Sequence, residues 1–130
     1  TVVAAEAVID GETILGMRKL ASTVPVIDDV LEYAVTLVSN THPELDSTSA
    51  TASRYIKYGA SPRAAQALIT AAKVRALMHG NYNVSYEDID ALAAPVLRHR
   101  IKISYGAINE KMNAEDVVAA LVKENKKLSK

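Results

Sequence analysis

The chain has 130 residues, enough for a single domain with a substantial core, and 49% of them are hydrophobic, which argues against disorder. Its 15 basic and 15 acidic residues cancel, so the net charge does not favour nucleic acid or an anionic membrane as a partner. The lack of cysteine excludes disulfides and thiolate metal sites and fits a cytoplasmic protein. No apolar run approaches the length of a membrane span, so we expect no membrane partner.

Two helices are predicted in the first third of the chain. The first runs from Glu12 to Ala21, and the second runs from Asp28 to Asn40 with apolar residues at helical spacing. Asp28 and Asp29 suit the positive end of the helix dipole, and Pro43 ends the helix. The polar stretch from Glu44 to Thr51 indicates a solvated loop.

A third helix is expected to form the centre of the fold. After a short helical approach from Arg54 to Tyr58, it runs from Pro62 to His79, and Gly80 ends it. Its surface is apolar nearly all round, which is typical of a helix that several neighbours bury. We therefore expect it to be the most buried helix, with Leu68 in the core.

Two pairs of polar residues mark the start of the last two predicted helices. Ser85 with Asp88 resembles a capping box, and Asn113 with Asp116 caps the fifth helix in the same way. Pro95 lies inside the fourth helix and is expected to kink it or split it in two.

Together these elements predict an all-α fold, a small bundle of about five helices. We expect one domain over residues 1–130, with at most a trace of strand near Val84 and a charged tail from Lys123 to Lys130 that frays.

The segment from Tyr58 to Ala64 carries the most informative side chain. Ser61 is a good N-cap and Pro62 suits the first helical position, so Arg63 lies in the first turn and points back past the helix N-terminus. A cation there opposes the helix dipole. A bound phosphate in front of the helix would explain the arginine. The alternative is an ordinary capped helix whose arginine pairs with a nearby carboxylate.

Three motifs in order resemble the C-terminal lid of the MoxR family of AAA+ ATPases: GASPRA at 59–64, NVSYEDI at 83–89 and VLRHRI at 96–101. The resemblance covers roughly Glu12 to Tyr105. It implies a helical AAA+ lid fold, and it implies that Arg63 is the sensor-2 arginine, with Ser61 as the N-cap at the phosphate-facing end. Many relatives have an arginine where this chain has His42, so no role transfers to that position.

The resemblance also implies a function for the longer protein. The lid would close over ATP bound to a core domain and bring Arg63 to the γ-phosphate, with Mg²⁺ held by that core. The expected partners are the core of the same chain, neighbouring subunits of a hexameric ring and an unknown client protein that is assembled or activated by ATP hydrolysis.

The sequence contains no phosphate-binding loop, and it starts at Thr1 rather than methionine. We therefore expect a domain excised from a larger ATPase, which is not an enzyme by itself and holds neither ATP nor Mg²⁺ alone. The alternative is a helical protein-interaction module with no role in nucleotide binding.

The remaining polar clusters are better explained by structure. The three histidines, His42, His79 and His99, are too scattered for a zinc site, so we expect no metal. Arg98 and Arg100 close a helix, where cations are favourable. The family resemblance adds that Arg98 and Arg100 could contact another domain or subunit.

Overall fold

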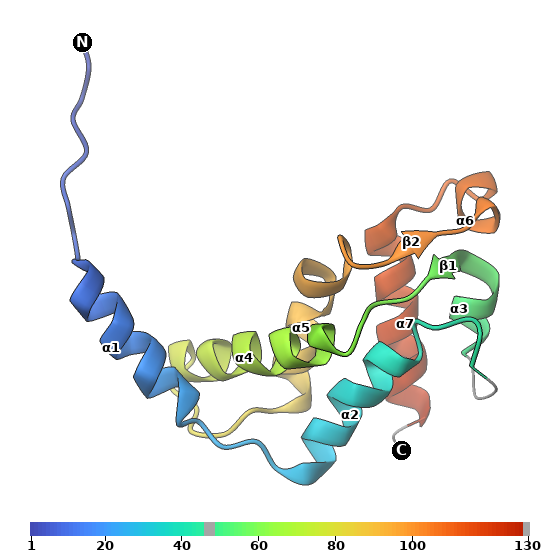
Figure 1. Ribbon diagram of the computed structural model, residues 1–130, viewed down its shortest axis with the longest axis horizontal. Coiled ribbons are helices and arrows are strands. Elements are labelled where there is room, and N and C mark those ends of the chain that lie inside the picture. Colours follow the sequence, from blue (N-terminus) through green and yellow to red (C-terminus); the bar gives the residue numbers. More distant parts are fainter. Residues whose placement is uncertain (46–48, 129–130) are drawn as a thin grey trace.

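The computed structural model describes residues 1–45 and 49–128, and within them it has seven helices and a two-stranded ribbon (Figure 1). The elements, in chain order, are α1 (Gly11–Ser22), α2 (Asp28–Ser39), α3 (Ala50–Tyr55), β1 (Ile56–Tyr58), α4 (Arg63–Met78), α5 (Tyr86–Leu97), β2 (Lys102–Ile103), α6 (Tyr105–Asn109) and α7 (Ala114–Leu128). The predicted helical bundle is confirmed. The two additional helices, α3 and α6, are short.

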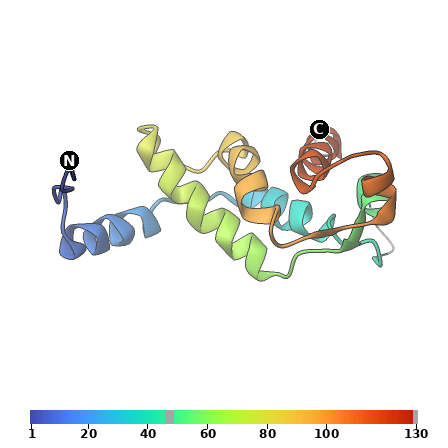
Figure 2. The same cartoon turned by 90° about the horizontal axis from the view of Figure 1, so that it is seen from above.

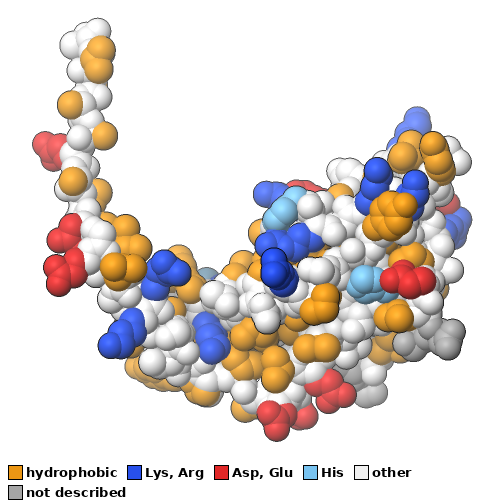
Figure 3. Space-filling model, viewed as in Figure 1, with side chains coloured by type: hydrophobic (Ala, Val, Ile, Leu, Met, Phe, Trp, Pro, Cys, Tyr) orange, Lys and Arg blue, Asp and Glu red, His pale blue; other side chains and the backbone are white. Residues whose placement is uncertain are grey.

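Helix α4 runs through the middle of the molecule. Helices α1, α2 and α5 pack against it, and α7 packs against α2, α3 and α5 (Figures 1 and 2). Residues 1–10 extend away from the bundle at one end, and the β1–β2 ribbon lies at the other end. Between these two ends the molecule is hollowed (Figure 3), and α4 forms the floor of this hollow face (Figure 1).

The core is built mainly from small and aliphatic side chains. Helix α4 contributes a single stripe at every fourth residue, Ala64, Leu68, Ala72 and Ala76, each 0% exposed. The small alanines let the neighbouring helices approach α4 closely.

The prediction that α4 is the most buried helix is wrong. Helix α2, although shorter, buries five residues against the four of α4. The neighbours of α4 leave part of its surface uncovered, so Val74 is 40% exposed and Met78 is 78% exposed.

The predicted helix starts and stops are largely confirmed. Ser85 and Asp88 form a complete capping box at the start of α5. At the start of α7, the Asn113 backbone N–H donates to Asp116 Oδ2, and the Asp116 N–H donates to Asn113 Oδ1. Gly80 follows α4 with a φ of 72°, a left-handed conformation that favours glycine.

Pro95 does not split α5, which continues through it to Leu97. A proline inside a helix leaves the carbonyl four residues earlier without its usual donor. Here that carbonyl belongs to Ala91, and the helix continues for two residues beyond Pro95.

The segment before α4 differs from the prediction. Residues 54 and 55 end α3, and residues 56–58 form β1 rather than a helical approach. Ile56 pairs with Ile103 in antiparallel β2, so the ribbon forms far from Val84, where a trace of strand was expected. The expected loop over residues 44–51 falls partly on residues 46–48, outside the described residues, and α3 begins within it at Ala50.

The C-terminal tail is helical through Leu128, whereas fraying was expected from Lys123. Asn125 is 1% exposed, and its side-chain amide donates to the Tyr33 carbonyl at 3.3 Å. Glu124 accepts hydrogen bonds from the backbone N–H groups of Ala50 and Thr51 at the start of α3. These contacts hold the tail against the bundle as far as it is described, since Ser129 and Lys130 lie outside the described residues.

No helix in the described part of the chain combines the length and the apolar composition that a membrane span requires.

Candidate functional site

The start of α4 carries Arg63, as the sequence predicts, but Ser61 does not cap the helix with its side chain. Helix α4 begins at Arg63, and Pro62 is its N-cap with helical backbone angles, φ −56° and ψ −23°. The first turn closes through the backbone, because the Ala64 N–H donates to the Ser61 carbonyl at 2.9 Å and the Ala65 N–H donates to the Pro62 carbonyl at 3.1 Å. The predicted role of the Ser61 hydroxyl is therefore wrong.

The Arg63 side chain is exposed. Within residues 1–45 and 49–128, no carboxylate forms an ion pair with it and no side chain accepts a hydrogen bond from it. The alternative in which Arg63 pairs with a nearby carboxylate therefore finds no support in the described residues. A guanidinium that lies at the start of a helix and has no partner among the described residues is well placed to meet an anion.

The loop that leads into Arg63 is held by the end of α2. The Ala60 N–H donates to Thr41 Oγ1 at 2.9 Å, and the Ala60 carbonyl lies 2.6 Å from His42 Nε2. The other ring nitrogen of His42, Nδ1, lies 2.7 Å from Glu44 Oε1. The backbone N–H of Glu44, together with the His42 ring, holds the pKa of the Glu44 carboxyl below its usual range.

Sequence reasoning missed this arrangement, because Thr41 and His42 lie 18–19 residues before Ala60 in the chain. The sequence showed that His42 departs from the family pattern, but it did not indicate that the His42 ring contacts the Ala60 carbonyl.

Arg98 and Arg100 follow α5, whose end lies beside the first turns of α4 in both ribbon views (Figures 1 and 2). Arg98 Nη1 pairs with Glu115 Oε1 at 2.6 Å, and Arg100 Nη1 donates to the Val96 carbonyl at 2.8 Å. Basic and histidine side chains gather in the middle of the molecule, on the side of the hollow that faces residues 1–10 (Figure 3). Both arginines thus have partners within the domain, whereas Arg63 lacks one among the described residues.

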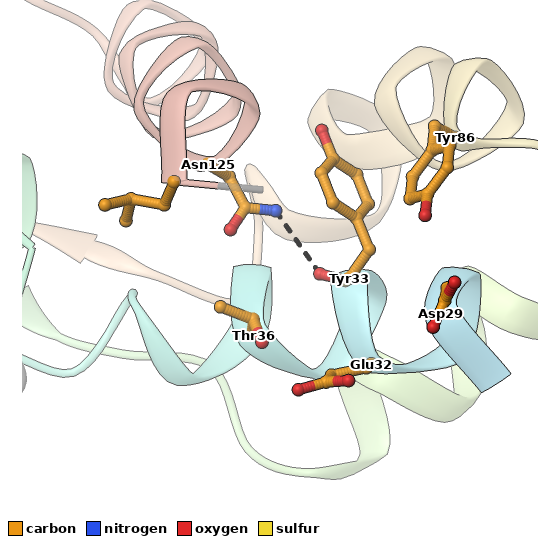
Figure 4. Close-up of a pocket in the computed structure, with 7 residues that line it drawn as sticks. Asp29, Glu32, Tyr33, Thr36, Tyr86 and Asn125 are labelled. Atoms are coloured by element: carbon orange, nitrogen blue, oxygen red, sulfur yellow. Dashed lines mark hydrogen bonds between the residues drawn. The ribbon is translucent and has the colours of Figure 1, made fainter. Parts of the chain in front are cut away.

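A separate hollow lies between α2, α5 and α7 (Figure 4). The rings of Tyr33 and Tyr86 meet edge to face there, with centroids 5.0 Å apart. The Tyr33 hydroxyl donates to Asp90 Oδ1 at 2.6 Å. Burial and the Asp90 carboxylate raise the pKa of Tyr33 well above its usual value. None of the residues of the predicted site lines this hollow.

The described residues contain no group of three or more histidine, aspartate or glutamate side chains that could hold a metal ion.

Comparison with known proteins identifies the fold. The family model of the AAA lid domain matches residues 48–121. Chaperone MoxR1 of Mycobacterium tuberculosis is 29% identical over 105 residues, which are 81% of this chain and 28% of that protein. Protein MoxR of Paracoccus denitrificans is 44% identical over 55 residues, which are 42% of this chain and 16% of that protein.

A crystal structure at 2.00 Å resolution, of a protein from Cytophaga hutchinsonii described as a candidate ATPase, superposes with a TM-score of 0.75 at 28% identity. The match covers 87% of this chain and 34% of the other. The chain thus spans about a third or less of the length of these relatives. It belongs to the AAA lid domain family and is a lid of the MoxR type of AAA+ ATPase.

Proposed function

We propose that this domain closes over ATP bound to the core of the same protein and that Arg63 is the sensor-2 arginine that contacts the γ-phosphate. The observation that carries this proposal is the exposed Arg63 at the start of α4, for which the described residues provide no carboxylate. The match to the AAA lid family supports it.

The chemistry of the arginine suits this role. A guanidinium presents several N–H donors in a planar fork and can bind two phosphate oxygens at once. Placed at the γ-phosphate, it would stabilise the negative charge that spreads over the transferring group. Because Arg63 reaches the phosphate only when the lid is closed, hydrolysis would release this contact and allow the lid to open.

The activity of the whole protein follows from the same proposal. The core would hold ATP and Mg²⁺, adjacent subunits would form a ring, and hydrolysis would drive the assembly or activation of a client protein in the cytoplasm. The name of the relative MoxR1, a chaperone, supports a chaperone-like role. The positions of Arg98 and Arg100 beside the start of α4 suit a contact with the core or with a neighbouring subunit.

The experiment compares three versions of the full-length protein: the parent, Arg63→Ala and Arg63→Lys. We expect Arg63→Ala to lower the rate of ATP turnover by about 100-fold or more, the effect typical of removing a charge-stabilising donor. Arg63→Lys should recover only part of the rate, because a point charge cannot replace a planar fork. Thermal stability should be unchanged, since an exposed side chain without partners contributes little to folding.

The matched control is Arg18→Ala, which removes another exposed arginine, on α1. Its turnover should equal that of the parent. If Arg63→Ala turned over ATP at the parental rate and melted at a lower temperature, Arg63 would be a structural residue and the domain would act as an interaction module instead.

A further inference from the structure

Thr41 and His42, which follow α2, form hydrogen bonds with both backbone polar groups of Ala60, three residues before Arg63. Thr41 Oγ1 accepts the Ala60 N–H at 2.9 Å while its own hydroxyl donates to the Val38 carbonyl at 2.6 Å. His42 Nε2 lies 2.6 Å from the Ala60 carbonyl. Thr41 and Ala60 are both 0% exposed, so the hydrogen bond between them has little competition from water, and the bond from His42 is partly buried.

Glu44 holds the His42 ring in place. A carbonyl oxygen can only accept a hydrogen bond, so His42 Nε2 must carry the proton that joins it to Ala60. Glu44 Oε1 lies 2.7 Å from the opposite ring nitrogen, Nδ1, and this second contact favours the ring orientation in which Nε2 faces Ala60.

The neighbouring glycine allows this close approach. A Cβ added at Gly59 would lie 2.6 Å from the Thr41 carbonyl oxygen, nearer than real Cβ atoms come to other atoms. The absence of a side chain at Gly59 therefore lets the chain run directly against the end of α2 before it turns into α4.

We propose that Thr41 and His42 are positioning residues that fix the direction of Arg63. This inference rests on the proposed sensor-2 role of Arg63. Since Pro62 has a restricted φ, only Ser61 separates the held residue Ala60 from the rigid start of α4. The hydrogen bonds of Thr41 and His42 therefore fix the start of α4 relative to α2. A small displacement of Ala60 would move the Arg63 guanidinium away from its position at the phosphate.

The first test uses amide hydrogen exchange of the 130-residue chain. Two substitutions of His42 are compared. In His42→Gln the side-chain N–H₂ lies three bonds from Cβ, as Nε2 does in histidine, so it can still reach the Ala60 carbonyl. In His42→Asn it lies only two bonds from Cβ, and the side chain is too short. We expect His42→Asn to speed exchange of the Ala60 amide by about 10-fold or more, because opening of the loop exposes it. In His42→Gln, the exchange rate of the Ala60 amide should stay within about 3-fold of the parental rate.

His79→Asn is the matched control. It changes a histidine at the other end of α4, where Nδ1 contacts the Arg75 carbonyl of its own helix. Exchange at Ala60 should not change in this variant. If the Ala60 amide exchanged at the parental rate in His42→Asn, the positioning proposal would be wrong, whether or not Arg63 is the sensor-2 arginine.

The second test measures ATP turnover in the full-length protein. We expect His42→Asn to lower kcat by about 10-fold with a smaller effect on KM, as misplacement of a catalytic group does, and His42→Gln to restore most of the rate. The double variant with Arg63→Ala should be no slower than Arg63→Ala alone, because residues that act through one group are not additive.

These outcomes separate the two proposals. Suppose that Arg63→Ala turns over ATP slowly. If His42→Asn then has the parental rate, or if the double variant is slower than Arg63→Ala by the full factor that His42→Asn causes alone, the lid function stands and the positioning role is wrong. If Arg63→Ala matches the parent, the sensor-2 role fails, and the positioning of Arg63 for catalysis fails with it.

Discussion

Asp88 illustrates at the scale of one residue how a charged group is accommodated in this core. It is 1% exposed, accepts a hydrogen bond from Arg75 Nη1 at 2.6 Å and accepts another from the Ser85 N–H at 2.9 Å. Burial raises the pKa of Asp88, but the bonds from Ser85 and Arg75 outweigh burial and hold the pKa below its usual value. Its contribution to stability is therefore present above the unfolded pKa of about 3.9 and is lost as the pH falls through the lower folded value.

The two capping boxes allow a matched test of this arrangement. Asp88→Ala should lower the free energy of unfolding by about 3 kcal/mol, because it removes the acceptor of the Ser85 N–H and leaves the partly buried Arg75 guanidinium without its partner. Asp116→Ala removes the equivalent acceptor of the Asn113 N–H at the start of α7, at an exposed position, and should cost about 1 kcal/mol. Urea denaturation measures both, and equal losses would show that the Arg75–Asp88 pair adds nothing to the cap.

At the scale of elements, local signals were sufficient where a helix end depends on neighbouring residues. The starts of α5 and α7 were predicted because each cap joins residues three positions apart. The helical tail was missed because its anchor joins Asn125 to Tyr33, 92 residues away. The candidate site also has one part that could be predicted from the sequence and one that could not. The motif around Arg63 indicates that residue, whereas the bond from His42 to Ala60 depends on how the segments after α2 and before α4 pack together.

The stripe along α4 predicts a sharp contrast between two aspartate substitutions in one helix. Leu68→Asp should be severely destabilising, by about 4 kcal/mol or more, because it places an unpaired charge where the side chain is 0% exposed. Val74→Asp, at a position that is 40% exposed, should cost about 1 kcal/mol or less. The check is thermal unfolding followed by circular dichroism. Equal melting temperatures for Leu68→Asp and the unsubstituted chain would contradict the core assignment.

The whole molecule is an open shape rather than a sphere. The hollow face lies between α1 and the β1–β2 ribbon, with α4 as its floor (Figures 1 and 3). Helix α1 buries only Ala21, and its large apolar side chains remain 45–62% exposed at Ile14, Leu15, Met17 and Leu20. A hollow face with exposed apolar side chains beside it suits a domain that works against another part of a longer protein, and the matched part of this chain makes up about a third or less of each relative.

The structure of the full-length protein with Mg²⁺ and a non-hydrolysable ATP analogue tests the central claim most directly. In the closed state, we expect a guanidinium nitrogen of Arg63 to lie about 2.7–2.9 Å from a γ-phosphate oxygen, the distance of a charge-assisted hydrogen bond. A closed lid in which Arg63 instead pairs with a protein carboxylate, or in which another arginine of this domain occupies the γ-phosphate, would contradict the assignment of Arg63 as sensor 2.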